Sequence, residues 1–284
     1  MLKKIIMALV LTFAFFALLY SKSAKNSPIS EKAPAVTGTF KIEVLKTGKS
    51  DAMILYTENH TVIIDCGETE DAQKVLDTLA AKNINDADYM FITHFDKDHV
   101  GGAPEVIDNI DIRSIVVPDY SGNSKEYERY IESCRKRNIS PVRLKEKLSF
   151  VLDDVLFEVY PPMKSEYAEG DNDFSLAICV THGENTFLFA GDAEAERIKE
   201  FEKQFKPEHI FLKVPHHGRY NDETEKFLKS VSPSYAVITC GRKTPPDDRV
   251  ISILESLGCE TFLTANGRIL IESNGKKLNL QQKQ

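Results

Sequence analysis

Residues 89–104 read YMFITHFDKDHVGGAP, so an apolar strand is followed by two histidines and two aspartates within six positions. These four side chains would repel each other or compete for protons unless a positive charge lay among them. Neutral imidazole and carboxylate together suit Zn, Mn or Fe, whereas a soft copper site would use thiolates. A solvated acidic loop is the alternative. We therefore expect a metal site, with ligands from His94, Asp96, Asp98 and His99.

Three other apolar strands also end in ligand-type residues. Asp65 closes TVIID, Asp192 closes TFLFAGD, and His216 and His217 close IFLKVPHHG. One such aspartate is more often a turn or cap residue than a ligand. Three endings of this kind beside a His/Asp cluster favour a common cation, because buried carboxylates without a cation are costly.

The remaining polar residues of these strands give weaker signals. Lys213 lies within the apolar run that precedes the paired histidines, where it either contacts a substrate anion or extends to water. His60, His182 and His209 fall in turns or at a strand edge, so we expect them on the surface.

Hydrophobic periodicity predicts antiparallel strands first and strand–helix units afterwards. This order is typical of two sheets with helices outside, and polar clusters at the ends of strands are typical of α/β sites. We expect helices at 70–83, 124–138, 194–205, 222–231 and 248–258, and strands at 39–46, 52–57, 61–67, 88–94, 114–118, 148–162 (two strands), 175–181, 185–192, 209–218, 235–241 and 259–280.

The 284 residues, 42% hydrophobic and 28% charged, fit one large domain at 38–284 better than two. Residues 1–20 begin with a basic pair and continue with an apolar run, which indicates an export signal or a membrane anchor, with a buried helix as the alternative. Residues 21–37 are rich in Ser, Lys and Pro and are expected to form a flexible linker. This organisation places the body outside the cytoplasm.

Cysteine usage and net charge limit the function classes. The five cysteines are odd in number and have no CxxC spacing, so we interpret them as small core residues. The net charge is −7, and beyond residue 35 the chain holds 31 basic and 42 acidic residues, a balance of −11. This balance argues against tight nonspecific DNA binding but leaves room for a local basic groove.

The stretch HFDKDHVGG, with IDCG upstream and FAGD and PHHG downstream, resembles the metallo-β-lactamase superfamily. The closer similarity is to the hydrolase domain of ComEC-type competence proteins and their stand-alone relatives. It is carried by GKSDAMIL, VIIDCG, THFDKDHVGG, NDFSLAI, TFLFAGDAE and LKVPHHG, over about residues 40–218. The resemblance implies an α/β fold, an αβ/βα sandwich, that holds one or two divalent metal ions, Zn or Mn.

Each motif residue acquires an implied role from this resemblance. Asp96 takes the place of the second histidine in the superfamily's His-x-His-x-Asp-His, as it does in the ComEC-type branch. Asp192 stands for the carboxylate that bridges two metals, and Asp65 for an aspartate that supports the metal loop. One of the two histidines at 216–217 is a ligand and the other a proton donor or substrate contact. The implied ligands are His94, Asp96, Asp98, His99, Asp192 and His216, with His217 as the alternative to His216.

Two departures from the family pattern affect the second metal position. CGRKTPPDDRV lacks a histidine that the branch commonly has, and Asn172 or Asp173 stands where other members supply a metal-binding histidine. The second metal site is therefore expected to be weaker or absent, and Asn172 becomes a candidate substrate contact, together with Lys213. A carboxylate-rich set shifts the preference toward Mn without excluding Zn.

The expected function is an exported metal-dependent hydrolase, a phosphodiesterase or nuclease of the ComEC-like branch. A metal lowers the pKa of bound water from roughly 15.7 toward 7, so a metal-bound hydroxide attacks the phosphorus. Asp98 or Asp192 would orient the hydroxide, and His216 or His217 would protonate the leaving group. The partners expected are a phosphodiester substrate, with DNA as one candidate, and the membrane through the N-terminal segment. The alternatives are a hydrolase of a small ester, lactone or cell-wall phosphodiester, which the −11 balance favours, and a non-catalytic competence or surface partner with a degraded metal site.

Overall fold

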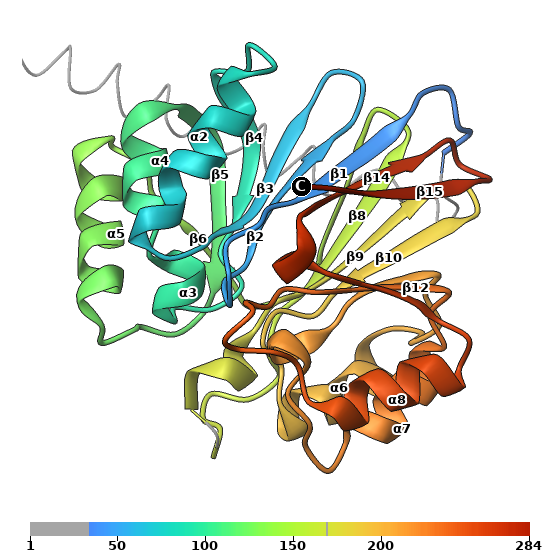
Figure 1. The fold of residues 1–284 in the computed structure, drawn as a ribbon. Coiled ribbons are helices and arrows are strands. Elements are labelled where there is room, and N and C mark those ends of the chain that lie inside the picture. Colours follow the sequence, from blue (N-terminus) through green and yellow to red (C-terminus); the bar gives the residue numbers. More distant parts are fainter. Residues whose placement is uncertain (1–33, 169) are drawn as a thin grey trace, which may run out of the picture. The chain divides into compact units, whose positions relative to one another are not determined.

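Two β-sheets stack face to face in the computed structural model, which describes residues 34–168 and 170–284 (Figure 1). Residues 34–284 form one compact unit. The first sheet contains, in spatial order, β15 (Leu278–Lys283), β14 (Arg268–Ser273), β1 (Phe40–Val44), β2 (Ala52–Tyr56), β3 (Thr61–Cys66), β4 (Asp86–Phe91), β5 (Asp111–Pro118) and β6 (Val142–Leu144). The second contains β13 (Glu260–Leu263), β12 (Tyr235–Ile238), β11 (Phe211–Lys213), β10 (Asn185–Phe189), β9 (Ala177–His182), β8 (Val155–Tyr160) and β7 (Leu148–Leu152).

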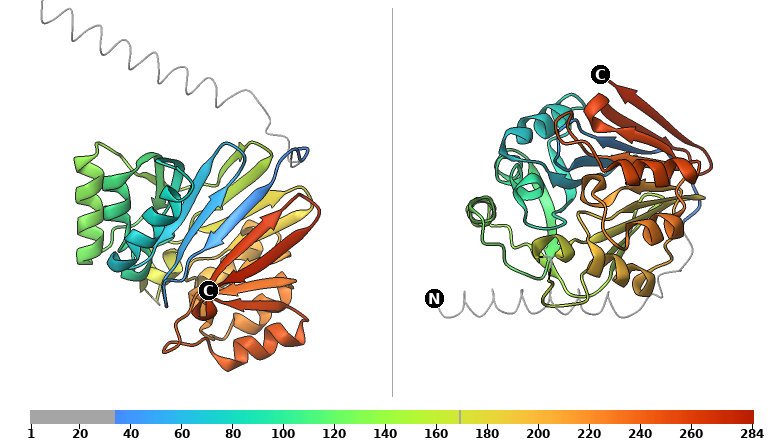
Figure 2. Two further views of the ribbon diagram at one scale, coloured as in Figure 1. Left: turned by 45° about the horizontal axis from the view of Figure 1, so that its top comes forward. Right: turned by 60° about the horizontal axis from the view of Figure 1, so that its bottom comes forward.

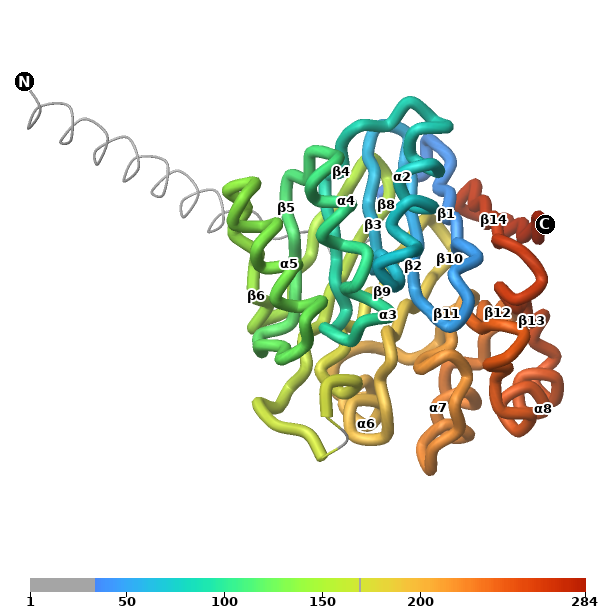
Figure 3. Tube along the Cα trace, turned by 60° about the vertical axis from the view of Figure 1, so that its left-hand side comes forward, coloured from blue at the N-terminus to red at the C-terminus, as the bar shows by residue number. Residues whose placement is uncertain are grey.

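Helices cover the outer face of each sheet (Figures 2 and 3). The chain forms α2 (Ala72–Ala80), α3 (Lys97–Val100), α4 (Ala103–Asn109) and α5 (Lys125–Lys136), and later α6 (Ala195–Gln204), α7 (Thr224–Val231) and α8 (Asp248–Ser256). Apolar residues of α2, α4 and α5 pack against the first sheet, and those of α6, α7 and α8 against the second. Between the sheets lies a third core, rich in phenylalanine, which includes Phe40, Phe91, Phe157 and Phe187. The αβ/βα sandwich expected from the sequence is confirmed.

Strand direction determines where polar residues can gather. β3 runs parallel to β4, and β10 runs parallel to β11 and β12, so the carboxyl ends of each set meet at one edge of its sheet. β1 lies between β14 and β2 and pairs with both in antiparallel register. The first sheet is therefore completed by strands from both ends of the described chain.

Most elements expected from periodicity are present, but α3, α4 and β6 were not among them, and one inner strand of the second sheet differs in length. The strand expected at 209–218 is shorter, because β11 ends at Lys213 and Pro215–Gly218 form a tight turn. All five cysteines are free and buried, which confirms them as core residues. The expected export segment at 1–20 and the linker as far as residue 33 lie outside the described residues. Within the described part of the chain, no helix is both long and apolar enough to span a bilayer.

Two of the three histidines expected on the surface are buried. His182 lies at the end of β9, where its ring meets that of Phe40 and its Nδ1 lies 2.8 Å from Ser273 Oγ. His209 is covered because its ring packs edge-on against Phe205. His60 is half-buried. The surface prediction failed because a turn position in sequence does not reveal what another strand places above it.

Candidate metal centre

The loop after β4 turns sharply so that two ligand-type side chains face inward. Asp96 has extended backbone angles and its carbonyl accepts the first hydrogen bonds of α3, from His99 and Val100. This short helix buries Asp98 and His99. Gly102 then lies so close to the end of β3 that a Cβ there would stand 2.3 Å from the carbonyl oxygen of Cys66. A side chain at this position would push the loop away from the sheet.

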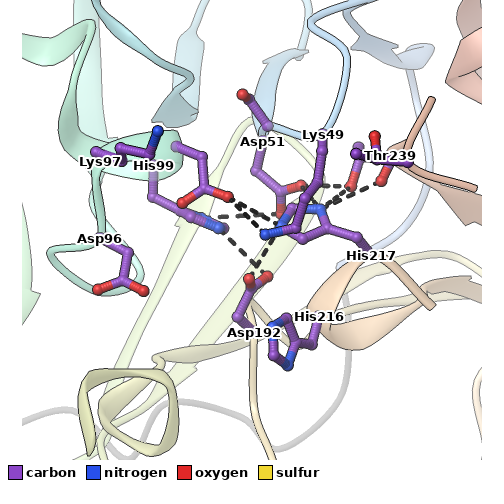
Figure 4. A network of polar contacts seen from close by, with 12 residues as sticks. Lys49, Asp51, Asp96, Lys97, His99, Asp192, His216, His217 and Thr239 are labelled. Atoms are coloured by element: carbon purple, nitrogen blue, oxygen red, sulfur yellow. Dashed lines mark hydrogen bonds and ion pairs between the residues drawn. The ribbon is translucent and has the colours of Figure 1, made fainter. Parts of the chain in front are cut away.

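Four buried residues bring their ligand atoms within 4.8 Å of one another: Asp98, His99, Asp192 and His217. His99 Nε2 lies 3.3 Å from Asp192 Oδ1, and His217 Nε2 lies 3.0 Å from Asp192 Oδ2 and 3.4 Å from Asp98 Oδ2. Figure 4 shows the imidazoles of His99 and His217 directed toward Asp192 from two sides. The four residues come from α3, from the end of β10 and from the turn after β11, so both sheets contribute.

The donor set fits a divalent cation. Within the described residues, Nε2 of His94, His99 and His217 and Oδ1 of Asp192 are buried and make no hydrogen bond of acceptable geometry. Unsatisfied buried polar atoms are rare, because each costs about 1–3 kcal/mol. Burial alone would raise the pKa of the Asp192 carboxyl, but the nearby His217 and His99 hold it well below its usual value. A carboxylate ionised in this way beside imidazole nitrogens is a typical divalent metal ligand.

Asp65 fixes the orientation of His99. One carboxylate oxygen accepts hydrogen bonds from the Thr93 hydroxyl (2.7 Å) and lies 2.8 Å from His99 Nδ1, and the other accepts from the Thr93 backbone N–H (2.8 Å). With Nδ1 occupied, Nε2 is the nitrogen left for the four-residue group. This is the arrangement by which a carboxylate supports a metal-binding histidine, and it is where the resemblance placed Asp65.

A buried ion pair lies behind the group, and sequence reasoning missed half of it. Lys213 Nζ contacts Asp51 Oδ2 and lies 3.7 Å from Asp192 Oδ1, with the Lys213 side chain fully buried. The option that Lys213 extends to water is therefore wrong, and burial leaves it no path to a substrate anion. Asp51 also accepts a hydrogen bond from the Thr239 hydroxyl (2.5 Å), which in turn lies 3.0 Å from His217 Nδ1.

The turn after β11 separates the two adjacent histidines. His216 (φ 46°, ψ 47°), His217 (φ 54°, ψ 27°) and Gly218 (φ 74°) all lie in the left-handed region, which is strained for side chains other than glycine. His217 enters the four-residue group, whereas His216 Nδ1 lies 2.8 Å from Glu194 Oε1. Of the two histidines between which the sequence left the choice open, the structure brings His217 into this group and leaves His216 outside it. Burial lowers the pKa of His216 to about 4.

His94 and Asp96 occupy a neighbouring, less complete position. His94 Nε2 lies 3.8 Å from Asp96 Oδ2, and the Asp96 side chain is 44% exposed. The pKa of Asp171 is raised by burial and by the nearby Asp96 carboxylate, so a second carboxyl group lies beside this pair. Sequence reasoning did not single out Asp171.

Asn172 and Asp173 do not supply the histidine that is missing from the family pattern. Asn172 Nδ2 donates to Glu194 Oε1 (2.9 Å), so it holds the residue that contacts His216. Asp173 Oδ1 accepts from the backbone N–H groups of Glu194 and Arg197 and thereby caps the start of α6. Asn172 remains a candidate substrate contact.

Comparison with known proteins identifies relatives of the whole body. Residues 45–242 match the family described as the metallo-beta-lactamase superfamily. The chain is 24% identical to ComE operon protein 3 of Bacillus subtilis over 259 residues, which are 83% of this chain and 33% of that protein. It is 23% identical to Recombination protein 2 of Haemophilus influenzae over 253 residues, 86% of this chain and 30% of that protein. Competence protein ComA of Neisseria gonorrhoeae is 25% identical over 222 residues, 77% of this chain and 29% of that protein. The chain thus spans about a third of the length of these relatives.

Solved structures share the fold at low sequence identity. The metallo-beta-lactamase fold protein YhfI from Bacillus subtilis superposes with a TM-score of 0.52 at 11% identity, covering 80% of this chain and 96% of that one. Igni18, a metallo hydrolase from Ignicoccus hospitalis, gives a TM-score of 0.51 at 16% identity, with coverages of 86% and 100%. At these identities the likeness concerns the arrangement of helices and strands.

Proposed function

The chain belongs to the metallo-β-lactamase superfamily, and from this premise we propose that it is a metal-dependent hydrolase of phosphodiesters. One observation carries the proposal: four buried ligand-type residues converge from both sheets, and Nε2 of His99, Nε2 of His217 and Oδ1 of Asp192 have no hydrogen bond within the described chain. A structural core would satisfy these atoms with protein partners. A cation satisfies them together.

Each side chain has a defined part in this proposal. Asp98, His99, Asp192 and His217 would hold one divalent ion, and His94 and Asp96 would contribute to a second position. A bound divalent ion lowers the pKa of a coordinated water to about 7 and polarises the scissile bond. Asp98, at the solvent side of the group, accepts a hydrogen bond from the attacking water and orients it.

His216 is the candidate for proton transfer during hydrolysis. It lies outside the four-residue group but beside Asp192 (Figure 4). Its Nδ1 is held by Glu194 and burial lowers its pKa to about 4, so at neutral pH Nε2 carries no proton and would accept one from the attacking water. We do not assign proton transfer to His217, because its Nε2 faces Asp98 and Asp192.

The cellular setting is part of the same proposal. The relatives named above include a ComE operon protein and a competence protein, and the N-terminal run is typical of export signals or anchors. We therefore propose an extracytoplasmic hydrolase of the competence type, anchored in the membrane or secreted. DNA is one candidate phosphodiester.

The test measures metal binding and turnover on the same full-length protein. Mn or Zn binding is followed by calorimetry, and turnover with bis-p-nitrophenyl phosphate, single-stranded DNA and p-nitrophenyl acetate. We expect metal-dependent cleavage of the diesters, and loss of both metal binding and cleavage in Asp192→Asn. Asp86→Asn, at the exposed start of β4, is the matched control and should behave as wild type.

Each other result points to a different function. Cleavage of the acetate ester without cleavage of either diester would overturn the phosphodiester assignment. Metal binding without turnover of any substrate would favour the non-catalytic surface partner.

A further inference from the structure

Three loops form a continuous rim on one side of the metal centre: 46–50, 215–219 and 241–247. A Cβ atom placed on Gly241 would stand 3.7 Å from the backbone of the 46–50 loop. The backbone N–H of Asp247 donates to a carbonyl of the 215–219 turn over 2.9 Å. The 241–247 loop therefore contacts both of the others, and any charge that it carries lies close to theirs.

This rim is basic although the body as a whole is acidic. Lys49 Nζ lies 3.2 Å from Asp98 Oδ2, so it reaches the four-residue group, and its side chain is 32% exposed. Arg219 lies two residues after His217, and Arg242 and Lys243 lie at the tip of the 241–247 loop. All three are exposed, and within residues 34–168 and 170–284 none of them forms an ion pair. Their charge is therefore available to a ligand.

The opposite side of the centre carries the other sign. Asp96 lies on the side of Asp192 away from His217 (Figure 4), and its side chain is 44% exposed. An anionic chain that passes the metal centre would be repelled by this side and attracted by the other. This charge distribution favours a bound polyanion that extends from the metal centre along the basic rim and not past Asp96.

We propose that Lys49, Arg219, Arg242 and Lys243 bind successive phosphates of a phosphodiester strand next to the bond that is cleaved. The inference rests on the proposed function and gives it a substrate class, a strand that bears several phosphates rather than a neutral ester. Each lysine or arginine that neutralises a phosphate of a single strand releases a counterion, which contributes about 0.7 to the slope of log affinity against log salt. The acidic balance of the body argues against a large basic face, and a local set of four cations is compatible with that.

The experiment measures binding apart from catalysis. A fluorescent 12-nucleotide single-stranded DNA is titrated with full-length protein in chelator, at several salt concentrations, by anisotropy. Arg242→Gln/Lys243→Gln should weaken binding at low salt about tenfold and reduce the salt slope by about 1.4, since two phosphate contacts are lost. An abasic oligonucleotide of equal length should respond to the same variant in the same way, because the rim contacts phosphates.

A matched control removes an equal charge elsewhere. Lys276→Gln/Lys277→Gln changes the exposed turn between β14 and β15, at the opposite end of the first sheet. It should leave binding and its salt slope as in wild type. Equal binding by wild type and the rim variant, equal losses in both variants, or no binding of the abasic strand would each overturn the inference.

The two proposals fail separately. If neither wild type nor any variant cleaves a diester, but Arg242→Gln/Lys243→Gln still binds the DNA strand more weakly than wild type, the hydrolase proposal is wrong and the strand-binding site is supported. If diesters are cleaved but strand binding does not depend on residues 242 and 243, only the strand site falls.

Discussion

Lys213→Met removes the ammonium group that faces Asp51 where neither side chain is exposed. The variant leaves a carboxylate buried without its cation, and losing one partner of a buried pair typically costs about 3–5 kcal/mol. We expect the lower end of this range, because Asp51 keeps the hydrogen bond from the Thr239 hydroxyl. The measurement is the free energy of unfolding in urea at pH 7, followed by circular dichroism in the presence of chelator.

Two further variants make the reasoning falsifiable. Lys213→Met/Asp51→Asn removes both charges and retains an oxygen for Thr239, so it should recover most of the lost stability. Lys229→Met breaks an exposed pair with Glu225 one helical turn away and should cost no more than about 0.5 kcal/mol. A cost below about 1 kcal/mol for Lys213→Met, or a double variant less stable than the single one, would refute the account of this ion pair.

Two other perturbations test the loop and the far end of the sandwich. Gly102→Ala places a Cβ 2.3 Å from the Cys66 carbonyl oxygen, so the free energy of unfolding in urea should fall by about 2 kcal/mol or more. In the control Gly38→Ala, the new Cβ would lie at an ordinary 3.5 Å from Glu58, so this free energy should change little. Burial lowers the pKa of His182 despite the nearby Asp154. The unfolded chain therefore binds a proton at this imidazole more readily than the folded chain does. As a result, the stability of the fold should decrease as the pH drops through about 6.5. Melting temperatures between pH 7.5 and 5.5 should show a shallower fall for His182→Gln; an unchanged slope would contradict this.

The strand ends were predictable because each apolar run stops at a polar residue. Asp65, Asp192 and the 94–99 loop all lie at the expected edge, since parallel strands bring their carboxyl ends together. Local sequence carries this information, and the family motifs strengthen it.

Other parts of the centre depend on tertiary contacts that local sequence does not reveal. Asp51 precedes a strand in GKSD, a pattern typical of a turn, and only the arrival of Lys213 from the other sheet makes it part of the centre. The choice between His216 and His217 depends on left-handed backbone angles, which the residue types do not indicate. His182 shows the same limit, because Ser273 and Phe40 cover it from the two ends of the chain.

The pairing of β1 with β14 has a consequence for biosynthesis. Phe40 lies opposite Ser273, 233 positions later in the chain. During synthesis, β1 therefore exposes an unpaired strand edge until β14 has emerged. Such long-range closure is slow, and an open strand edge invites pairing with other chains. The first sheet can therefore close only after β14 has been synthesised.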